Sequence, residues 1–234
     1  MKLSPALVAF LVTFLGAVLF LPVAAHAAGD PLPYASAGTI KLPQPVLEGK
    51  VSLERTLLQR RSTRQYANTP MSLSDVSQLL WAAQGATGAG GKRTAPSAGA
   101  LYPLDVYVVA GNVTGLPAAI YAYEPNKHEL RMIAEGDART ELSKAARGQA
   151  SAKDAPAVLV ISAVYERTTA KYGERGIRYV HMEAGHAAQN VYLQAAARNL
   201  GTVVMGAFDD DGVRRVMRMK DHGQPLYLMP VGNK

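Results

Sequence analysis

Residues 177–201 read IRYVHMEAGHAAQNVYLQAAARNLG, and they carry the longest helical periodicity in the chain. Apolar or small side chains recur there three or four positions apart, at Ile177, Val180, Ala184, Ala187, Ala188, Val191 and Ala195. This spacing lines one face of an α-helix, which Gly201 is predicted to end. Because most of these side chains are alanines, a neighbouring helix can approach closely. The stretch therefore predicts a long helix with a close helical neighbour.

Shorter elements of both kinds surround this helix. Ser72 and Asp75 form a variant capping box for a helix through Trp81 to Gln84. Further helices are predicted over 53–59, 138–147 and 210–217, strands over 106–109, 158–163, 202–205 and 226–231, and a hairpin pairing 119–123 with 129–133. Residues 85–99 form a loop of small residues, and no internal repeat is present. Helices mixed with strands that include a hairpin predict an α+β fold in one domain.

The composition narrows the classes of protein that fit. Hydrophobic residues make up 48% of the 234 residues and charged residues 18%, which excludes a disordered chain and a coiled coil. The absence of cysteine excludes zinc ribbons, iron–sulfur clusters, disulfides and thiol catalysis. Basic residues outnumber acidic ones 25 to 18, but no nucleic-acid-binding motif accompanies them. A small anionic ligand therefore fits better than a nucleic acid.

The N-terminus is typical of a secretory signal peptide. Lys2 precedes an apolar run over residues 7–21, and Ala25-His26-Ala27 offers a small-x-small cleavage site. We therefore expect a signal peptide over 1–27, an extended leader over 28–50 and the folded domain over 51–234. This organisation predicts an exported, periplasmic protein. The alternative is that the apolar run stays uncleaved as a membrane anchor, although it is short for that purpose.

Three motifs that suggest ligand chemistry do not hold. Residues 85–94 lack the first Gly and the final Ser/Thr of a phosphate-binding P-loop and follow a helix rather than a strand. His181 and His186 are five positions apart, so they point to different faces of a helix, and no metal is expected. The acidic run 209–211 is typical of a helix N-terminus.

Two other segments offer binding chemistry. Arg60-Arg61-Ser62-Thr63-Arg64 places three guanidinium groups and two hydroxyls within five residues, a set suited to a phosphate, although a solvated helix end is the plainer interpretation. Residues 95–103, APSAGALYP, carry small side chains that allow backbone to approach a flat ligand, although an ordinary surface turn has the same composition.

In this order, the segments resemble the FMN-dependent nitroreductase superfamily, and within it the SagB-type dehydrogenases that form thiazoles and oxazoles in ribosomal peptides. The resemblance rests on residues 60–64, 80–85, 95–103, 183–190, 205–208 and 230–232, and it extends from Leu53 to the C-terminus. It implies a nitroreductase-like fold, a central mixed or antiparallel sheet with flanking helices, and an intertwined homodimer.

The resemblance also implies a set of FMN contacts. Arg60, Arg61, Ser62 and Arg64 match the segment that holds the phosphate and ribityl chain. Pro96, Ser97, Ala98 and Gly99 match the loop that reaches the partner's flavin. Met205, Gly206 and Ala207 match the backbone beside the isoalloxazine, and Lys234 lies near the basic C-terminal phosphate contact. Ala100 and Gly206 depart from the Asn and Glu that many members carry, so side-chain contacts are absent there.

The implied activity is two-electron hydride chemistry at bound FMN, on an unidentified small-molecule or peptide substrate. The alternative is an exported flavin-binding protein or carrier without catalysis, which the missing Asn and Glu side chains favour. No catalytic set emerges from the sequence. Tyr102, Tyr172, Tyr179 and His186 are weak candidates for proton donors. Because NAD(P)H is a cytoplasmic pool, export predicts that the flavin does not turn over NADH or NADPH efficiently.

Overall fold

The structure is a computed structural model that describes residues 38–88, 90–220 and 222–234. The predicted signal peptide over 1–27 and the first part of the predicted leader therefore lie outside the described residues. The predicted domain boundary at residue 51 stays a prediction. From residue 38 onward the chain enters the folded unit directly, because β1 (Thr39–Lys41) pairs with a strand of the main sheet and Leu42 is buried.

A seven-stranded sheet forms the centre of the fold, in the order β1-β6-β5-β3-β7-β9-β8. Its strands after β1 are β3 (Leu104–Ala110), β5 (Ala119–Glu124), β6 (Glu129–Glu135), β7 (Ala157–Ala163), β8 (Leu200–Thr202) and β9 (Gln224–Asn233). All of its strand pairs are antiparallel. Two short strands, β2 (Met71–Ser72) and β4 (Val113–Thr114), pair in parallel apart from it. The predicted α+β fold with a mainly antiparallel sheet is confirmed.

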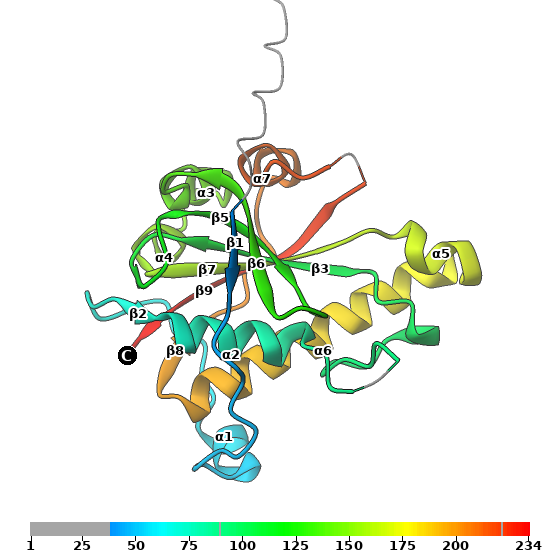
Figure 1. Cartoon of the computed structure of the whole chain (residues 1–234). Coiled ribbons are helices and arrows are strands. Elements are labelled where there is room, and N and C mark those ends of the chain that lie inside the picture. The colour runs from blue at the N-terminus through cyan, green and yellow to red at the C-terminus, as the bar shows by residue number, and fades with distance from the viewer. Residues whose placement is uncertain (1–37, 89, 221) are drawn as a thin grey trace, which may run out of the picture. The chain divides into compact units, whose positions relative to one another are not determined.

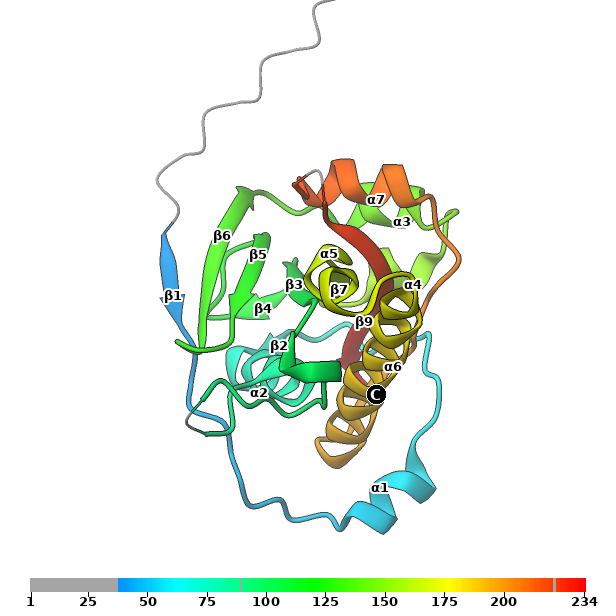
Figure 2. The same cartoon turned by 90° about the vertical axis from the view of Figure 1, so that its right-hand side faces the viewer.

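Helices cover both faces of this sheet (Figure 1). The helices are α1 (Leu53–Gln59), α2 (Leu73–Gln84), α3 (Arg139–Ala145), α4 (Ala150–Asp154), α5 (Glu166–Tyr172), α6 (Arg175–Ala197) and α7 (Asp210–Met217), with a 3-10 turn, η1, over Ala98–Ala100. Helices α2 and α6 pack on one face in the larger core cluster, and α3, α4 and α7 pack on the other. Helix α1 projects away from the sheet (Figure 2).

Strand β7 shows why the sheet needs helices on both sides. Every residue of this strand is buried. Because successive side chains of a strand point to opposite faces, Leu159 and Ile161 join the α2–α6 core while Val158 and Val160 join the other core. A continuous apolar run of this kind is typical of a central strand covered on both faces.

The predicted ends of α1, α2 and α7 agree with the structure, whereas α3 ends at Ala145 rather than at residue 147 and the end of α6 also differs. The Ser72 side chain accepts a hydrogen bond from the Asp75 N–H at 3.0 Å, so the predicted cap of α2 is confirmed. Gly201, however, does not end α6. The helix ends at Ala197, Asn199 adopts the left-handed conformation with φ of 56°, and Gly201 belongs to β8. Asn tolerates this conformation because its short polar side chain bonds locally.

Gly201 is required for a different reason. A Cβ at this position would lie 2.6 Å from the Thr63 Cγ2 atom, so only glycine lets the 60–64 segment pack this closely against β8. The strand predicted over 202–205 is displaced, because β8 runs from Leu200 to Thr202 and shares only Thr202 with the prediction.

Candidate functional site

The 60–64 segment leaves α1 and runs along the edge strand β8. Ser62 forms a parallel bridge with Thr202, and the Thr63 N–H donates to the Thr202 carbonyl at 2.8 Å. Because β8 is the outermost strand at its end of the sheet, the segment lies at the sheet edge. The arginine- and serine-rich stretch is therefore fixed by backbone pairing.

Two further predicted segments reach the same edge. Residues 203–207 follow β8 directly, and Met205 pairs with Leu228 of β9 through hydrogen bonds of 2.8 and 3.0 Å. At the end of β9, Asn233 pairs with Leu200, and the exposed Lys234 follows. The structure thus brings together three of the four predicted cofactor segments, at 60–64, 205–207 and 234.

Tyr192 of α6 links two of these segments, and sequence reasoning did not select it. Its hydroxyl lies 3.1 Å from the Ser62 Oγ atom and accepts a hydrogen bond from the Val204 N–H at 2.8 Å. The Arg60 guanidinium carbon lies 5.0 Å from the centre of the Tyr192 ring, a cation–π distance. The only sequence signal was the position of Tyr192 on the predicted helix, which does not indicate its distant partners.

The charges of this edge are mostly unneutralised. Among the described residues, neither Arg60 nor Arg64 nor Lys234 forms an ion pair. Arg61 differs, because its Nη1 atom donates to the carbonyls of Leu58 at 3.0 Å and Arg60 at 2.7 Å. Its guanidinium therefore turns back onto the end of α1. The remaining cations form an anion-binding arrangement.

The backbone of Gly206 and Ala207 is open to a ligand. Both residues are exposed, and within the described part of the chain no acceptor is paired with either N–H group. A Cβ built on Gly206 would have no atom closer than the Tyr227 ring at 4.0 Å. A flat group can therefore approach this backbone without a steric obstacle.

The fourth predicted segment, 96–99, lies elsewhere. The Ser97 side chain accepts from the Tyr102 N–H at 2.9 Å, and Gly99 takes a positive φ of 61°. A Cβ at Gly99 would meet the Tyr172 hydroxyl oxygen at 2.7 Å, so this loop packs on α5. Ser97 lies beside Glu183 of α6, which is nine positions before Tyr192 and thus about 14 Å from it along the helix axis. The structure does not bring this loop to the other three segments of the same chain.

A buried polar chain supports the loop and was not predicted. The Arg93 Nη1 atom donates to the Gln84 side chain at 3.1 Å, and the Gln84 amide reaches Glu183 at 3.5 Å. Glu183 is 2% exposed, and burial raises its pKa, an effect that hydrogen bonds from Ser97 and Gln84 and the nearby Arg93 partly offset. Gln84 and Glu183 are 99 positions apart, so no local pattern could reveal their contact.

The other candidate side chains take ordinary roles in the structure. The His181 Nε2 atom lies 2.6 Å from the Tyr165 hydroxyl, His186 is exposed and Glu183 is buried, so these three do not converge. No metal-type cluster of His, Cys, Asp or Glu occurs in the described ranges. Tyr172 and Tyr179 pack edge to face at 5.2 Å.

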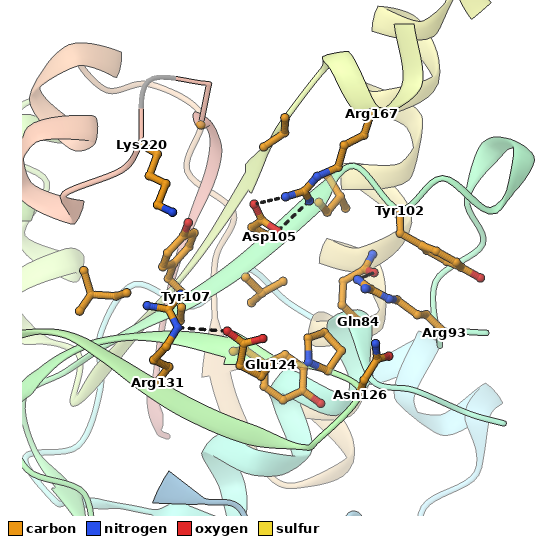
Figure 3. A pocket seen from close by; sticks show the side chains of 18 of the residues that line it. Gln84, Arg93, Tyr102, Asp105, Tyr107, Glu124, Asn126, Arg131, Arg167 and Lys220 are labelled. Carbon is orange, nitrogen blue, oxygen red and sulfur yellow. Dashed lines mark hydrogen bonds and ion pairs between the residues drawn. The ribbon is translucent and has the colours of Figure 1, made fainter. Parts of the chain in front are cut away.

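A cavity of about 930 Å³ lies at the beginning of β3 (Figure 3). Its floor comes from the beginning of β3 and the end of β5, and its wall includes Gln84, Arg93 and Tyr102. Leu104, at the beginning of β3, pairs with Ala163 at the end of β7. Ala157, at the start of β7, pairs with Val231, and Val231 in turn pairs with Thr202 of β8. The seven residues of β7 therefore separate this cavity from the Arg60–Ser62 edge by about 20 Å.

This fold belongs to a known class of oxidoreductases. Residues 57–233 match the nitroreductase family, and the chain is a member of that family. The chain is 46% identical over 196 residues to MJ1384 of Methanocaldococcus jannaschii, which carries the name of a nitroreductase, in an alignment that covers 84% of this chain and 98% of that protein. The predicted family is thereby confirmed, and the chain is a nitroreductase-family oxidoreductase.

Two further relatives are named for microcin B17 processing and for the trifolitoxin operon. The microcin B17-processing protein McbC of Escherichia coli is 29% identical over 133 residues, which are 55% of this chain and 49% of that protein. The trifolitoxin operon protein TfxC of Rhizobium leguminosarum is 27% identical over 192 residues, covering 75% of this chain and 54% of that protein. The chain thus spans about half the length of these two relatives.

Solved structures confirm the fold. A crystal structure from Ralstonia eutropha that bears the nitroreductase name superimposes with a TM-score of 0.74 at 33% identity, covering 83% of this chain and 89% of that one. The Escherichia coli microcin synthetase complex McbBCD, with a truncated precursor bound, contains a chain that matches with a TM-score of 0.65 at 23% identity, over 95% of this chain and 84% of that one. At this identity the second match shows the fold alone.

The predicted periplasmic location, with its membrane-anchored alternative, is wrong. Its basis was the segment 1–27, which lies outside the described residues. None of the described helices is long and apolar enough to cross a membrane. Because 98% of MJ1384 aligns with only 84% of this chain, the remaining part of this chain has no counterpart in that nitroreductase-family relative. The expectation that NAD(P)H is not used rested on export and is withdrawn with it.

Proposed function

We propose that this chain is an FMN-dependent oxidoreductase that works as a homodimer. One observation carries the proposal: three segments far apart in the sequence meet at one sheet edge and present cations and free N–H groups together. Arg60, Ser62 and Arg64 lie beside the end of β8, and Gly206 follows on the same side. This set of donors fits a phosphate joined to a flat, hydrogen-bonding ring.

The phosphate end of FMN fits the arginine cluster. A phosphate carries more than one negative charge near neutral pH, and guanidinium forks bind it with two parallel hydrogen bonds. Arg60 and Arg64 lack carboxylate partners among the described residues, so their charges are available to such a group. Ser62 adds a hydroxyl donor, and Lys234 adds a point charge. Arg61 is a weaker candidate, since its guanidinium already contacts the end of α1.

The ring end of FMN fits the backbone of Gly206 and Ala207, whereas the Met205 N–H already donates to the Leu228 carbonyl. Unused N–H groups on an exposed glycine segment suit the nitrogen and oxygen acceptors along one edge of a flavin. When bound, FMN would supply two-electron hydride chemistry. The residues of this chain would hold its phosphate, orient the ring against β8 and donate hydrogen bonds to its edge. The absence of a side chain at Gly206 leaves those contacts to the backbone.

Homodimer formation is proposed on two grounds. The 96–99 loop lies about 14 Å along α6 from Tyr192, so a partner's copy of the loop is the simpler route to a shared flavin. In addition, the large apolar side chains that stay exposed gather on two regions of the described chain, the α1 region and α6: Val46, Leu47, Leu53, Leu57, Leu58, Ile177 and Met182. An exposed apolar patch of this kind marks a protein contact surface.

The substrate is proposed to be a small molecule or a peptide. The names of McbC and TfxC connect two relatives with microcin B17 processing and with the trifolitoxin operon. MJ1384 and the Ralstonia eutropha protein carry the broader nitroreductase name. Tyr102 and Tyr172 adjoin the 96–99 loop, and we propose them as proton donors at a flavin that this loop completes.

The absorbance spectrum of the purified protein tests the proposal. We expect a yellow protein, or one that turns yellow with added FMN, and bleaching of the flavin bands on addition of a reductant such as dithionite, NADH or NADPH. A protein that binds FMN but whose flavin is reduced by dithionite alone, and by no candidate donor or substrate, would indicate flavin binding without catalysis. A protein that stays colourless and leaves FMN fluorescence unchanged would contradict the proposed cofactor altogether.

A further inference from the structure

We propose that the cavity above the beginning of β3 is a second ligand site, which binds an organic anion through the Arg93 guanidinium. The ligand class is a carboxylate or phosphate monoester with an apolar or aromatic body. The cavity lies about 20 Å along β7 from the Arg60–Ser62 edge, and a flavin competition tests whether the anion and FMN occupy separate sites.

The cavity wall carries an excess of positive charge. Its lining contains the cations Arg93, Lys127, Arg131, Arg167, Arg218 and Lys220, and the carboxylates Asp105 and Glu124. Both carboxylates are already paired. Asp105 accepts two hydrogen bonds from Arg167, at 2.8 and 3.1 Å, and Glu124 accepts one from Arg131 at 3.2 Å (Figure 3). Four cations are left without an acidic partner among the described residues.

Arg93 is the cation best prepared for recognition. Its guanidinium carbon lies 4.8 Å from the centre of the Tyr102 ring, and its Nη1 atom donates a hydrogen bond to the Gln84 side chain. Its Nε atom is buried without a partner, and burial lowers its pKa, so the charge is partly desolvated. A desolvated guanidinium gains more from an incoming anion than an exposed one does. The Arg93 Nη2 atom is the donor left for the ligand. It is not among the buried unpaired atoms, and it makes no hydrogen bond within the described residues.

The floor of the cavity favours an apolar body on the ligand. Ala122 and Ile133 come from neighbouring strands of the sheet, and the Tyr107 ring lies on the same face because Tyr107 pairs with Ala122. The cavity is large enough for a drug-sized or dipeptide-sized molecule, since small-molecule sites commonly measure about 300–1,000 Å³. An inorganic ion alone would leave most of this volume unused. The arrangement therefore suits an anionic head at Arg93 with a hydrophobic body over the strands.

Isothermal titration calorimetry on the purified full chain, saturated with FMN, tests the site. The probes are 3-phenylpropionate and phenyl phosphate, and the neutral control is 3-phenylpropanamide. We expect saturable binding of at least one anion and at least tenfold weaker binding of the amide. Preference for one anion over the other identifies the head group. Lack of binding by both anions, or equal binding of the amide, would overturn the proposal.

Substitutions locate the binding within the protein. Arg93→Gln should weaken anion binding by roughly tenfold or more, since it removes a charge-assisted hydrogen bond. Because this change touches the buried Gln84 contact, the surface variant Lys127→Gln/Arg218→Gln provides a second measurement and should weaken binding several-fold. Arg147→Gln makes the same kind of change on the exposed turn after α3 and should leave binding unchanged. Equal affinities in all four proteins would overturn the assignment.

A flavin competition separates this site from the proposed cofactor site. The same anion titration is repeated on protein freed of FMN, and the affinities are compared. Equal affinities support two separate sites. An anion that binds only the FMN-free protein, and is displaced by FMN, would show that both occupy one site and would overturn this inference while leaving FMN binding intact. Failure of FMN to bind at all would instead contradict the proposed function and leave the anion titration interpretable.

Discussion

The hydroxyl oxygens of Ser62 and Tyr192 lie 3.1 Å apart, although 130 positions separate the two residues in the sequence. The Tyr192 hydroxyl also accepts the Val204 N–H at 2.8 Å. One tyrosine on α6 therefore ties the 60–64 segment to the chain that leaves β8. In a site built from loops around a sheet edge, such a tie sets the spacing between the proposed phosphate and ring contacts.

We predict that Tyr192→Phe weakens FMN binding. The change removes only the hydroxyl, leaves the Val204 N–H without its acceptor and frees Ser62 from its partner. A lost hydrogen bond of this kind costs about 1 kcal/mol, so the midpoint of urea unfolding should fall slightly and the dissociation constant of FMN should rise roughly fivefold. Tyr179→Phe on the same helix is the control. Fluorescence titration with FMN measures the effect, and an unchanged affinity would show that the tie does not shape the site.

The arginines of the 60–64 segment should differ in their effects. Arg60→Ala and Arg64→Ala each remove an unpaired guanidinium, and hydrogen bonds to charged groups contribute roughly 1.5–3 kcal/mol, so FMN affinity should fall roughly tenfold or more in each. Arg61→Ala is the matched comparison. Because its guanidinium already binds two carbonyls, we expect a smaller loss. Retention of full affinity in both Arg60→Ala and Arg64→Ala would remove the phosphate assignment.

Local patterns predicted much of this fold. The Ser72–Asp75 cap, the hairpin of β5 and β6 and the buried run of β7 are all encoded within a few neighbouring residues, so the sequence indicates them directly. The short strands β1 and β2 were missed, because two or three residues cannot show a periodicity. The helix end was assigned to Gly201, although Asn199 also tolerates the left-handed conformation there.

The site was only partly predictable for a related reason. The arginine and serine residues at 60–64 cluster in the sequence, so their chemistry is visible there. Tyr192 and the Gln84–Glu183 contact depend on residues about 100 or more positions apart, which only the folded chain brings together. The cavity beneath Arg93 was likewise invisible, because its floor comes from three strands and its wall from a loop.

The exposed leucines of α1 allow a direct test of the proposed dimer. Leu57 and Leu58 are 52% and 64% exposed on a helix that projects from the domain (Figure 2). If they pack against a second copy, Leu57→Asp/Leu58→Asp places two charges in an apolar interface and should shift the protein to monomers in light scattering. Asn126→Asp, on an exposed turn, should leave the mass unchanged. A wild-type monomer that binds FMN tightly would contradict the shared site.

Gly232 should be sensitive to a single added methyl group. A Cβ at this position would lie 2.8 Å from the Pro156 Cδ atom and 2.9 Å from the Tyr66 Cβ atom, both in constrained surroundings. Gly232→Ala should therefore lower the free energy of unfolding by about 1–3 kcal/mol in urea titrations. Gly185→Ala on α6 is the opposite case, because its Cβ would meet nothing within 4 Å, and alanine is favoured in a helix by about 1 kcal/mol. Equal stability of the two variants would show that the end of β9 relaxes readily.

The last prediction concerns the pH dependence that Glu183 adds to stability. Burial raises the pKa of this carboxyl above 4.5, so the folded state holds its proton more tightly than the unfolded state does. The stability that comes from this proton is fully present below pH 4.5 and is lost as the pH rises through the folded pKa.

Glu183→Gln keeps the shape and the hydrogen-bonding capacity but cannot ionise. The free energy of unfolding of Glu183→Gln, relative to wild type, should therefore increase as the pH rises above 4.5 and then level off. Urea titrations between pH 4 and pH 8 measure this difference, and Glu135→Gln, an exposed change at the end of β6, is the control. A difference that stays flat with pH in Glu183→Gln would mean that hydrogen bonds from Ser97 and Gln84 fully offset the cost of burying the charge.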